Sequence, residues 1–108
     1  MMLPYEISAT DAAQVLGEKG ARLVDVREPW EFDVARIEGS LHLPMGEVPT
    51  RAQKELDVDE RLIVVCHHGV RSMNVTAWLR RQGFEKAQSL RGGIDAWAIE
   101  VDPGVARY

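Results

Sequence analysis

The chain has 108 residues, of which 45% are hydrophobic and 28% are charged, a balance typical of a globular domain with one core. The net charge of −4 argues against a nucleic-acid-binding surface. The sequence contains no apolar run of roughly 18 residues that could span a membrane, and it lacks the basic and apolar regions of a signal peptide. Its single cysteine cannot form an internal disulfide. We therefore expect a cytoplasmic protein.

The first elements of the chain alternate between helix and strand. Ser8 can cap a helix that ends at Gly17, because an acidic residue follows three positions later and apolar residues recur at helical spacing. Residues 22–27 are expected to form a strand whose apolar residues suit burial on both faces, as in a parallel sheet. Asp25 lies inside this strand and needs a partner there, since an unpaired buried carboxylate is costly.

Short elements fill the middle of the chain. Pro29 suits the first position of a helix, and residues 41–44 form a short strand that proline ends. A further short helix is expected after Pro49.

The second half repeats the alternation more clearly. Residues 62–65 form the most apolar β-branched run, and residues 72–82 follow with helical spacing. A strand over residues 86–90 and a helix over residues 94–99 come next, and residues 100–108 are expected to form an irregular tail on the surface. Regular alternation of strand and helix predicts an α/β fold, with a parallel sheet and helices on both faces.

The segment from Cys66 to Ser72 joins the apolar strand to the following helix. In an open α/β sheet this position is the carboxyl edge, where ligands bind. A cysteine reacts as the thiolate, and three features favour that form here: successive backbone N–H groups, the positive end of the helix dipole, and the charge of Arg71. Gly69 allows the loop to curl round the sulfur. We therefore expect a nucleophilic cysteine in an anion-binding loop.

Other interpretations of these residues stay open. Cys66 could be a small buried packing residue, because cysteine is among the most buried residue types. His67 and His68 could contact substrate or could be exposed loop side chains. The spacing of the cysteine and the two histidines is poor for a tetrahedral metal site, so we expect no metal.

Several segments, in their order along the chain, make the sequence resemble the rhodanese family from residue 7 to residue 97. The segments are residues 23–29 with Glu31 and Phe32, residues 37–44, residues 66–72, residues 83–84 and residues 90–97.

The resemblance implies a single rhodanese domain over residues 1–108, with a five-stranded parallel sheet. It also implies a rhodanese-type transferase, a thiosulfate sulfurtransferase that needs no cofactor. A donor such as thiosulfate gives its outer sulfur to Cys66, and a thiophilic acceptor, cyanide or a thiol, then removes it from the persulfide. Small-molecule donors and acceptors are the implied partners, and a protein acceptor is compatible with the same chemistry.

Carried over to this chain, the resemblance makes Cys66 the catalytic nucleophile. Residues 67–71 supply the N–H groups, and Arg71 offers its charge to the anionic donor. The expected substrate-binding residues are His67, His68, Gly69, Val70, Arg71 and Ser72. We interpret Asp25 and Arg27 as structural support, a buried pair that ties together the loops after adjacent strands.

Two competing functions use the same architecture. Cysteine phosphatases and arsenate reductases have five residues between the cysteine and the arginine, whereas four residues separate Cys66 from Arg71 here. The shorter loop favours a single sulfur atom over a tetrahedral oxyanion. The second alternative is a sulfur-carrier module that hands its persulfide to a partner protein. The sequence does not identify the physiological donor or acceptor.

Overall fold

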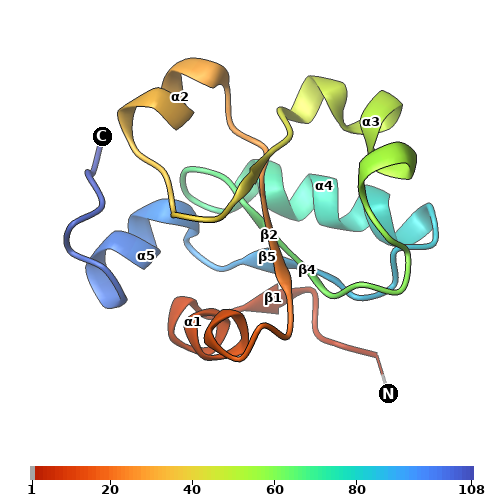
Figure 1. The fold of residues 1–108 in the computed structure, drawn as a ribbon, viewed down its shortest axis with the longest axis horizontal. Helices are drawn as coiled ribbons and strands as arrows, with labels where there is room; N and C mark the ends of the chain where they lie inside the picture. Colours follow the sequence, from red (N-terminus) through yellow and green to blue (C-terminus); the bar gives the residue numbers. More distant parts are fainter. Residues whose placement is uncertain (1) are drawn as a thin grey trace.

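Five strands form one parallel sheet in the computed structural model, which describes residues 2–108 (Figure 1). The strands are β1 (Glu6–Ile7), β2 (Arg22–Asp25), β3 (Leu41–His42), β4 (Leu62–Val65) and β5 (Ala87–Leu90). Their spatial order is β1-β5-β4-β2-β3, which places β4 in the centre of the sheet. Val24 of β2 and Ser89 of β5 both pair with Val64 of β4. The predicted parallel α/β sheet is confirmed.

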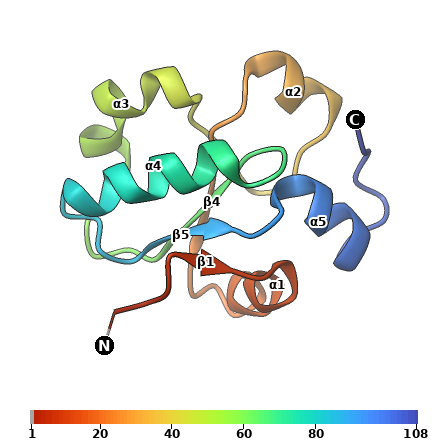
Figure 2. The same ribbon diagram turned by 180° about the vertical axis from the view of Figure 1, so that it is seen from behind.

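Helices cover both faces of this sheet, as expected from the alternation (Figure 2). They are α1 (Ala9–Gly17), α2 (Pro29–Val34), α3 (Val48–Glu55), α4 (Val70–Arg81) and α5 (Gly93–Glu100), and a 3₁₀ turn, η1 (Met45–Glu47), precedes α3. Helices α1 and α5 pack on one face, and α3 and α4 pack on the other. Within residues 2–108, none of these helices is long and apolar enough to cross a membrane.

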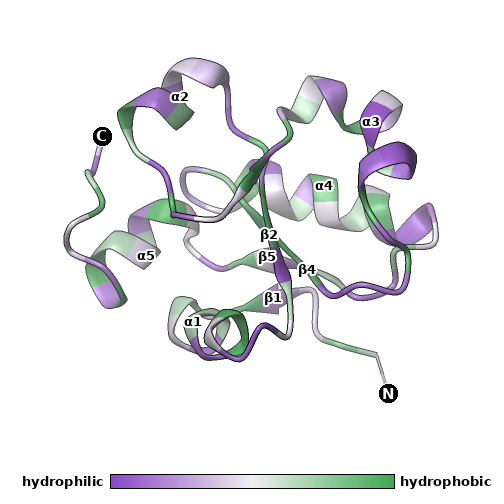
Figure 3. Cartoon of the chain, viewed as in Figure 1, coloured by the Kyte–Doolittle hydropathy of each residue, from purple (hydrophilic) through white to green (hydrophobic). Residues whose placement is uncertain are grey.

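The central strand supplies both halves of the core. Leu62 and Val64 of β4 belong to the apolar cluster that includes α3 and α4, whereas Ile63 and Val65 belong to the cluster with α1 and α5. This alternation follows from the two-residue period of a strand. All four side chains are fully buried, and β4 is hydrophobic along its length in Figure 3. Burial on both faces explains why the run reads as continuously apolar.

Local sequence signals explain how two helices begin. The Ser8 hydroxyl accepts a hydrogen bond from the Asp11 backbone N–H at 3.1 Å, so the expected N-cap of α1 is present. Pro29 begins α2, and the Glu31 carboxylate accepts a hydrogen bond from the Glu28 N–H at 3.0 Å. This second cap places Glu31 with its side chain turned inward, where it is 3% exposed.

The tail differs from its expected form. Helix α5 continues to Glu100, and residues 101–108 are irregular. They do not simply lie on the surface: Val101, Val105 and Tyr108 pack against the cluster that contains α1 and α5. The tail runs back from α5 towards α2 and ends beside it (Figures 1 and 2). The sequence pattern missed this return because turn residues mark where a chain bends, not what it then contacts.

Candidate active site

Cys66 lies at the carboxyl end of the central strand β4, and the residue is 1% exposed. Its Sγ accepts hydrogen bonds from two backbone N–H groups, that of Gly69 at 3.1 Å and that of Ser72 at 3.3 Å. Gly69 has a φ of +107°, a conformation that other residues rarely adopt, and it immediately precedes α4. The loop therefore folds back over the sulfur with its N–H groups turned inward, an arrangement that favours negative charge at that point.

Two serine hydroxyls continue the polar contacts of the sulfur. The Ser72 Oγ lies 3.3 Å from the Cys66 Sγ and 2.7 Å from the Ser89 Oγ. Both serines are fully buried. Ser89 belongs to β5, the neighbour of β4, and no sequence motif singled it out. Because the sheet order sets this contact, only the structure identifies it.

Helix α5 fixes the other side of the cysteine loop. The Ile94 N–H donates to the Cys66 carbonyl at 2.8 Å, and the Asp95 N–H donates to the His67 carbonyl at 3.2 Å. Gly93, just before them, has a φ of +63°. These contacts use the otherwise unpaired N–H groups at the start of a helix. The loop is thus held between the first turns of α4 and α5.

Arg71 does not stand free at the mouth of the loop. Its guanidinium donates two hydrogen bonds to the Glu31 carboxylate, at 2.6 and 2.9 Å. Hydrogen bonding to Arg71 lowers the pKa of Glu31 to about 2, and the same contact raises the pKa of Arg71. The Tyr108 hydroxyl also donates to Glu31, at 2.7 Å. The expectation that Arg71 offers its charge to a donor stays a prediction, but that charge is shared with Glu31.

Asp25 and Arg27 form a fully buried ion pair. The Arg27 Nε lies 2.9 Å from one Asp25 oxygen, and its Nη2 lies 2.6 Å from the other. Arg27 also donates to the Glu31 carbonyl at 3.1 Å and to the Tyr108 hydroxyl at 3.0 Å. The side-chain contacts differ from those expected, because they join α2 and the tail and not the loop after an adjacent strand. The supporting role of the pair stays a prediction.

The two histidines of the loop stack on one another. Their ring centroids are 3.9 Å apart, and the Tyr108 ring lies 3.9 Å from that of His67, nearly parallel to it. Burial, with a smaller effect from the neighbouring His68, lowers the pKa of His67. The His67 Nε2 is buried without a hydrogen-bond partner, whereas the His68 side chain is 62% exposed. Of the two, His68 is the more accessible to a substrate.

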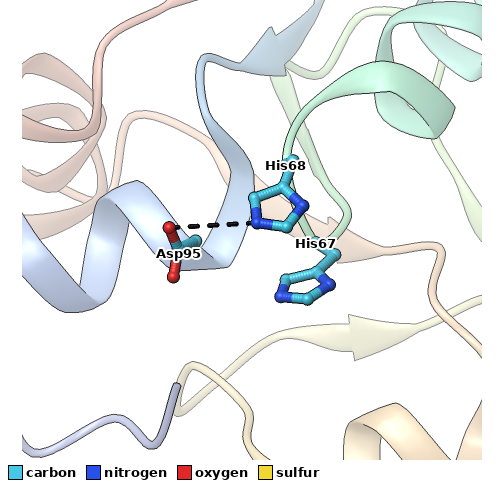
Figure 4. Close-up of side chains that lie close together, drawn as sticks. All are labelled: His67, His68 and Asp95. Atoms are coloured by element: carbon cyan, nitrogen blue, oxygen red, sulfur yellow. Dashed lines mark ion pairs between the residues drawn. The ribbon is translucent and has the colours of Figure 1, made fainter. Parts of the chain in front are cut away.

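Asp95 completes a small cluster with these histidines (Figure 4). The nearest potential ligand atoms of His67, His68 and Asp95 lie within 4.8 Å of one another. Asp95 also accepts a hydrogen bond from Arg107 at 2.8 Å. The arrangement is a ring stack beside an ion pair, and the expectation that no metal binds here stays a prediction.

Comparison with known proteins agrees with this geometry. A family model described as a rhodanese-like domain matches residues 8–100. A thiosulfate sulfurtransferase named GlpE, from Pseudomonas syringae pv. syringae, is 41% identical over 96 residues, which cover 89% of this chain and 90% of the relative. The chain belongs to the rhodanese-like family. At the level of the family it is a transferase of the rhodanese type, a sulfurtransferase.

Relatives differ in how much of their length the rhodanese-like domain occupies. The rhodanese-like/PpiC domain-containing protein 12 of Arabidopsis thaliana is 37% identical over 91 residues, but this chain spans only 30% of it. The human single-domain sulfurtransferase TSTD1 superposes with a TM-score of 0.85 at 25% identity, over 91% of this chain and 98% of that structure. The same fold therefore occurs both alone and as part of longer proteins.

The rhodanese-like loop gathers most of the residues expected at the site. Cys66, Gly69 and Ser72 meet at the sulfur, while Arg71 turns to Glu31. Val70 is 73% exposed beside them. Sequence reasoning assigned no role to Glu31 or Tyr108. The motif that includes Glu31 was the available signal for that residue, whereas nothing in the tail indicated Tyr108.

The ion pair at the site makes stability depend on pH. The pKa of Glu31 is about 2 in the folded protein and 4.5 as its ordinary value, so the ionised carboxylate stabilises the fold above that value. This stabilisation is lost as the pH falls from 4.5 towards 2. We expect Glu31→Gln to lower the free energy of unfolding at neutral pH by on the order of 3 kcal/mol, and to cost progressively less in acid. Urea titrations at several pH values measure this difference.

A second glutamate provides the control for this measurement. Glu55 also pairs with an arginine, Arg51, but both side chains in that pair are about one-third exposed, whereas Glu31 is buried. Glu55→Gln is expected to change stability little at any pH, because solvent screens exposed ion pairs. A pH-independent effect of Glu31→Gln would contradict the prediction.

Proposed function

We propose that this chain moves sulfane sulfur from an anionic donor such as thiosulfate to a thiophilic acceptor, with Cys66 as the carrier. The main support is the pair of N–H groups, of Gly69 and Ser72, that donate to the Cys66 Sγ. Donors fixed in place before reaction stabilise negative charge on sulfur without reorganisation. A lone thiol stays reduced in the cytoplasm, and we place the activity there.

In the first half-reaction the Cys66 thiolate attacks the outer sulfur of thiosulfate. A new S–S bond forms to Cys66, the S–S bond of thiosulfate breaks, and sulfite leaves with the electron pair. Cys66 then carries a persulfide whose terminal sulfur is the atom to be transferred. The N–H groups of residues 67–71 and of Ser72 line the loop in which this sulfur forms.

In the second half-reaction the acceptor attacks the terminal sulfur. With cyanide, a C–S bond forms, the Cys66 persulfide bond breaks, and thiocyanate leaves while the thiolate is restored. A thiol acceptor takes the sulfur in the same way and becomes a persulfide. Neither half-reaction needs a redox cofactor, because the leaving group takes with it the electron pair of the bond that breaks.

The remaining loop residues act on the donor in this scheme. Arg71 attracts the anion, although its pairing with Glu31 reduces the free charge it presents. His68 is exposed beside the loop, where its ring can contact the donor. Val70 is exposed and apolar, so it can contact the body of a larger substrate.

A protein acceptor is the second candidate, because apolar side chains stand exposed near the cysteine loop. Val70 opens α4 and is 73% exposed, and Trp30 in α2 is 61% exposed. Aromatic residues such as tryptophan are enriched at protein–protein interfaces. In this case the persulfide passes to a partner's cysteine. Movement of the one-sulfur adduct from Cys66 to a cysteine of an acceptor protein, followed by intact-mass spectrometry of both proteins, distinguishes this from small-molecule transfer.

The proposal is tested by intact-mass spectrometry after incubation with thiosulfate. We expect an adduct of one sulfur atom on the protein, which fragmentation assigns to Cys66 and which cyanide removes. The control is the Cys66→Ser protein under the same conditions, for which no adduct is expected. An adduct of equal yield on the serine variant would refute Cys66 as the carrier.

A further inference from the structure

Tyr108 reaches the cysteine loop from the far end of the chain. Its ring stacks on His67 with 3.9 Å between centroids and 11° between planes, and it meets Trp30 edge-on at 5.9 Å. The tail before it is anchored by Val105, which packs on the core, and by Arg107, which pairs with Asp95 of α5 at 2.8 Å. Contacts on both sides thus hold the tyrosine in one place.

The Tyr108 hydroxyl connects the two ion pairs of the site. It accepts a hydrogen bond from the Arg27 Nη1 at 3.0 Å and donates one to the Glu31 Oε2 at 2.7 Å. Burial raises the pKa of Tyr108 to about 12, so the hydroxyl keeps its proton for this contact at neutral pH. No other hydroxyl within residues 2–108 donates to Glu31.

Glu31 links Tyr108 to the cysteine loop through Arg71. Its two oxygens hold the Arg71 guanidinium, and Arg71 directly precedes Ser72, whose backbone N–H donates to the Cys66 Sγ at 3.3 Å. Arg71 favours the thiolate, and the charge of Glu31 opposes it. A hydrogen bond from Tyr108 compensates part of that opposing charge.

We propose that Tyr108 is a positioning residue for sulfur transfer, acting on Cys66 through Glu31 and Arg71. The inference rests on the proposed function, in which the Cys66 thiolate is the attacking group. The charged and titratable groups around this path are Arg27 with its partner Asp25, Glu31 in α2 and Arg71 in α4, together with His67, His68 and Asp95 beside the cysteine loop. Tyr108 itself contacts Arg27, Glu31 and His67, and it reaches Arg71 through Glu31.

The test is the pH dependence of Cys66 alkylation by iodoacetamide in Tyr108→Phe. This substitution keeps the ring that stacks on His67 and removes only the hydroxyl. Because Glu31 then loses a donor, we expect the midpoint of the alkylation profile to rise by about half a pH unit. At a fixed pH below the midpoint, alkylation slows by roughly threefold. A profile identical to that of the unsubstituted protein would overturn the proposal.

A double-mutant cycle separates this path from general loosening of the tail. In a Glu31→Gln background, Tyr108→Phe is expected to shift the profile no further, because the charge through which it acts is gone. An equal shift in both backgrounds would show that the tyrosine does not act through Glu31. Tyr5→Phe is the matched control, since Tyr5 is the other tyrosine, 47% exposed and packed against Arg80. It is expected to leave the profile unchanged.

Alkylation requires no sulfur donor, so this result is independent of the persulfide experiment. If no persulfide forms but the alkylation profile shifts as expected, the proposed function fails and the contact path stands. If the persulfide forms but Tyr108→Phe has no effect on the profile, the path fails and the proposed function stands.

Discussion

Replacing Cys66 with serine is expected to abolish the transfer of sulfur from thiosulfate to cyanide while the domain keeps its fold. A hydroxyl is a far weaker nucleophile than a thiolate and cannot carry a persulfide, so the turnover rate should fall by at least about 1,000-fold. The fold survives because serine is smaller than cysteine and its hydroxyl can use the same donors, the N–H groups of Gly69 and Ser72. Thiocyanate formation measures the activity.

Two controls accompany the serine variant. Circular dichroism and a thermal melt are expected to match those of the unsubstituted protein closely, which separates lost chemistry from lost structure. Alkylating Cys66 in the unsubstituted protein should remove activity to the same extent, because this is the only cysteine in the chain. Serine-variant turnover above about one hundredth of the original rate would contradict the nucleophilic role.

Gly93→Ala is expected to damage both stability and activity, although Gly93 carries no chemistry. A Cβ at this position would lie 2.3 Å from the His67 carbonyl oxygen and 2.5 Å from that of Cys66. Both atoms belong to the backbone of the cysteine loop, so they can yield only if the loop moves. The positive φ of +63° adds strain for any other residue. We expect a loss of about 2–4 kcal/mol in the free energy of unfolding and roughly 100-fold in activity.

Gly17→Ala is the matched control for this substitution. Gly17 ends α1 in helical conformation, and nothing lies within 4 Å of the position of its Cβ. Alanine is the better helix former, so this variant should be as stable as the original or slightly more stable, with unchanged activity. Equal effects of the two glycine substitutions in urea titration and in the activity assay would contradict the prediction that the close contact between α5 and the cysteine loop supports stability and activity.

The strand and helix on either side of Cys66 could be predicted because their signals are local. A run of β-branched residues is typical of a buried central strand, and the helical spacing after it identified α4, which begins at Val70, two residues earlier than expected. The sheet could be predicted from the alternation of such elements and from the order of several motifs along the chain. Positive φ values at Gly69 and Gly93 agree with the turns that these motifs imply.

The charge environment of the loop could not be predicted in the same way. Arg71 and Glu31 are 40 positions apart in the chain, and Tyr108 lies 81 positions from Arg27. Neither Glu31 nor Tyr108 carries a local sequence signal that predicts a contact with these arginines. The buried carboxylate of Glu31 was expected neither as a cap of α2 nor as the partner of Arg71, because one sequence does not show which distant groups meet.

The sequence by itself determined where the thiol stands and which backbone surrounds it, since strand, glycine turn and helix follow one another within a few residues. Only the tertiary structure decided which charged groups lie near that thiol and which ring stacks on His67. β2 lies beside β4 in the sheet, so the segments after them bring Glu31 and Arg71 together, and the tail then returns Tyr108 to both. These contacts depend on strand order and on a returning tail, which local propensity does not encode.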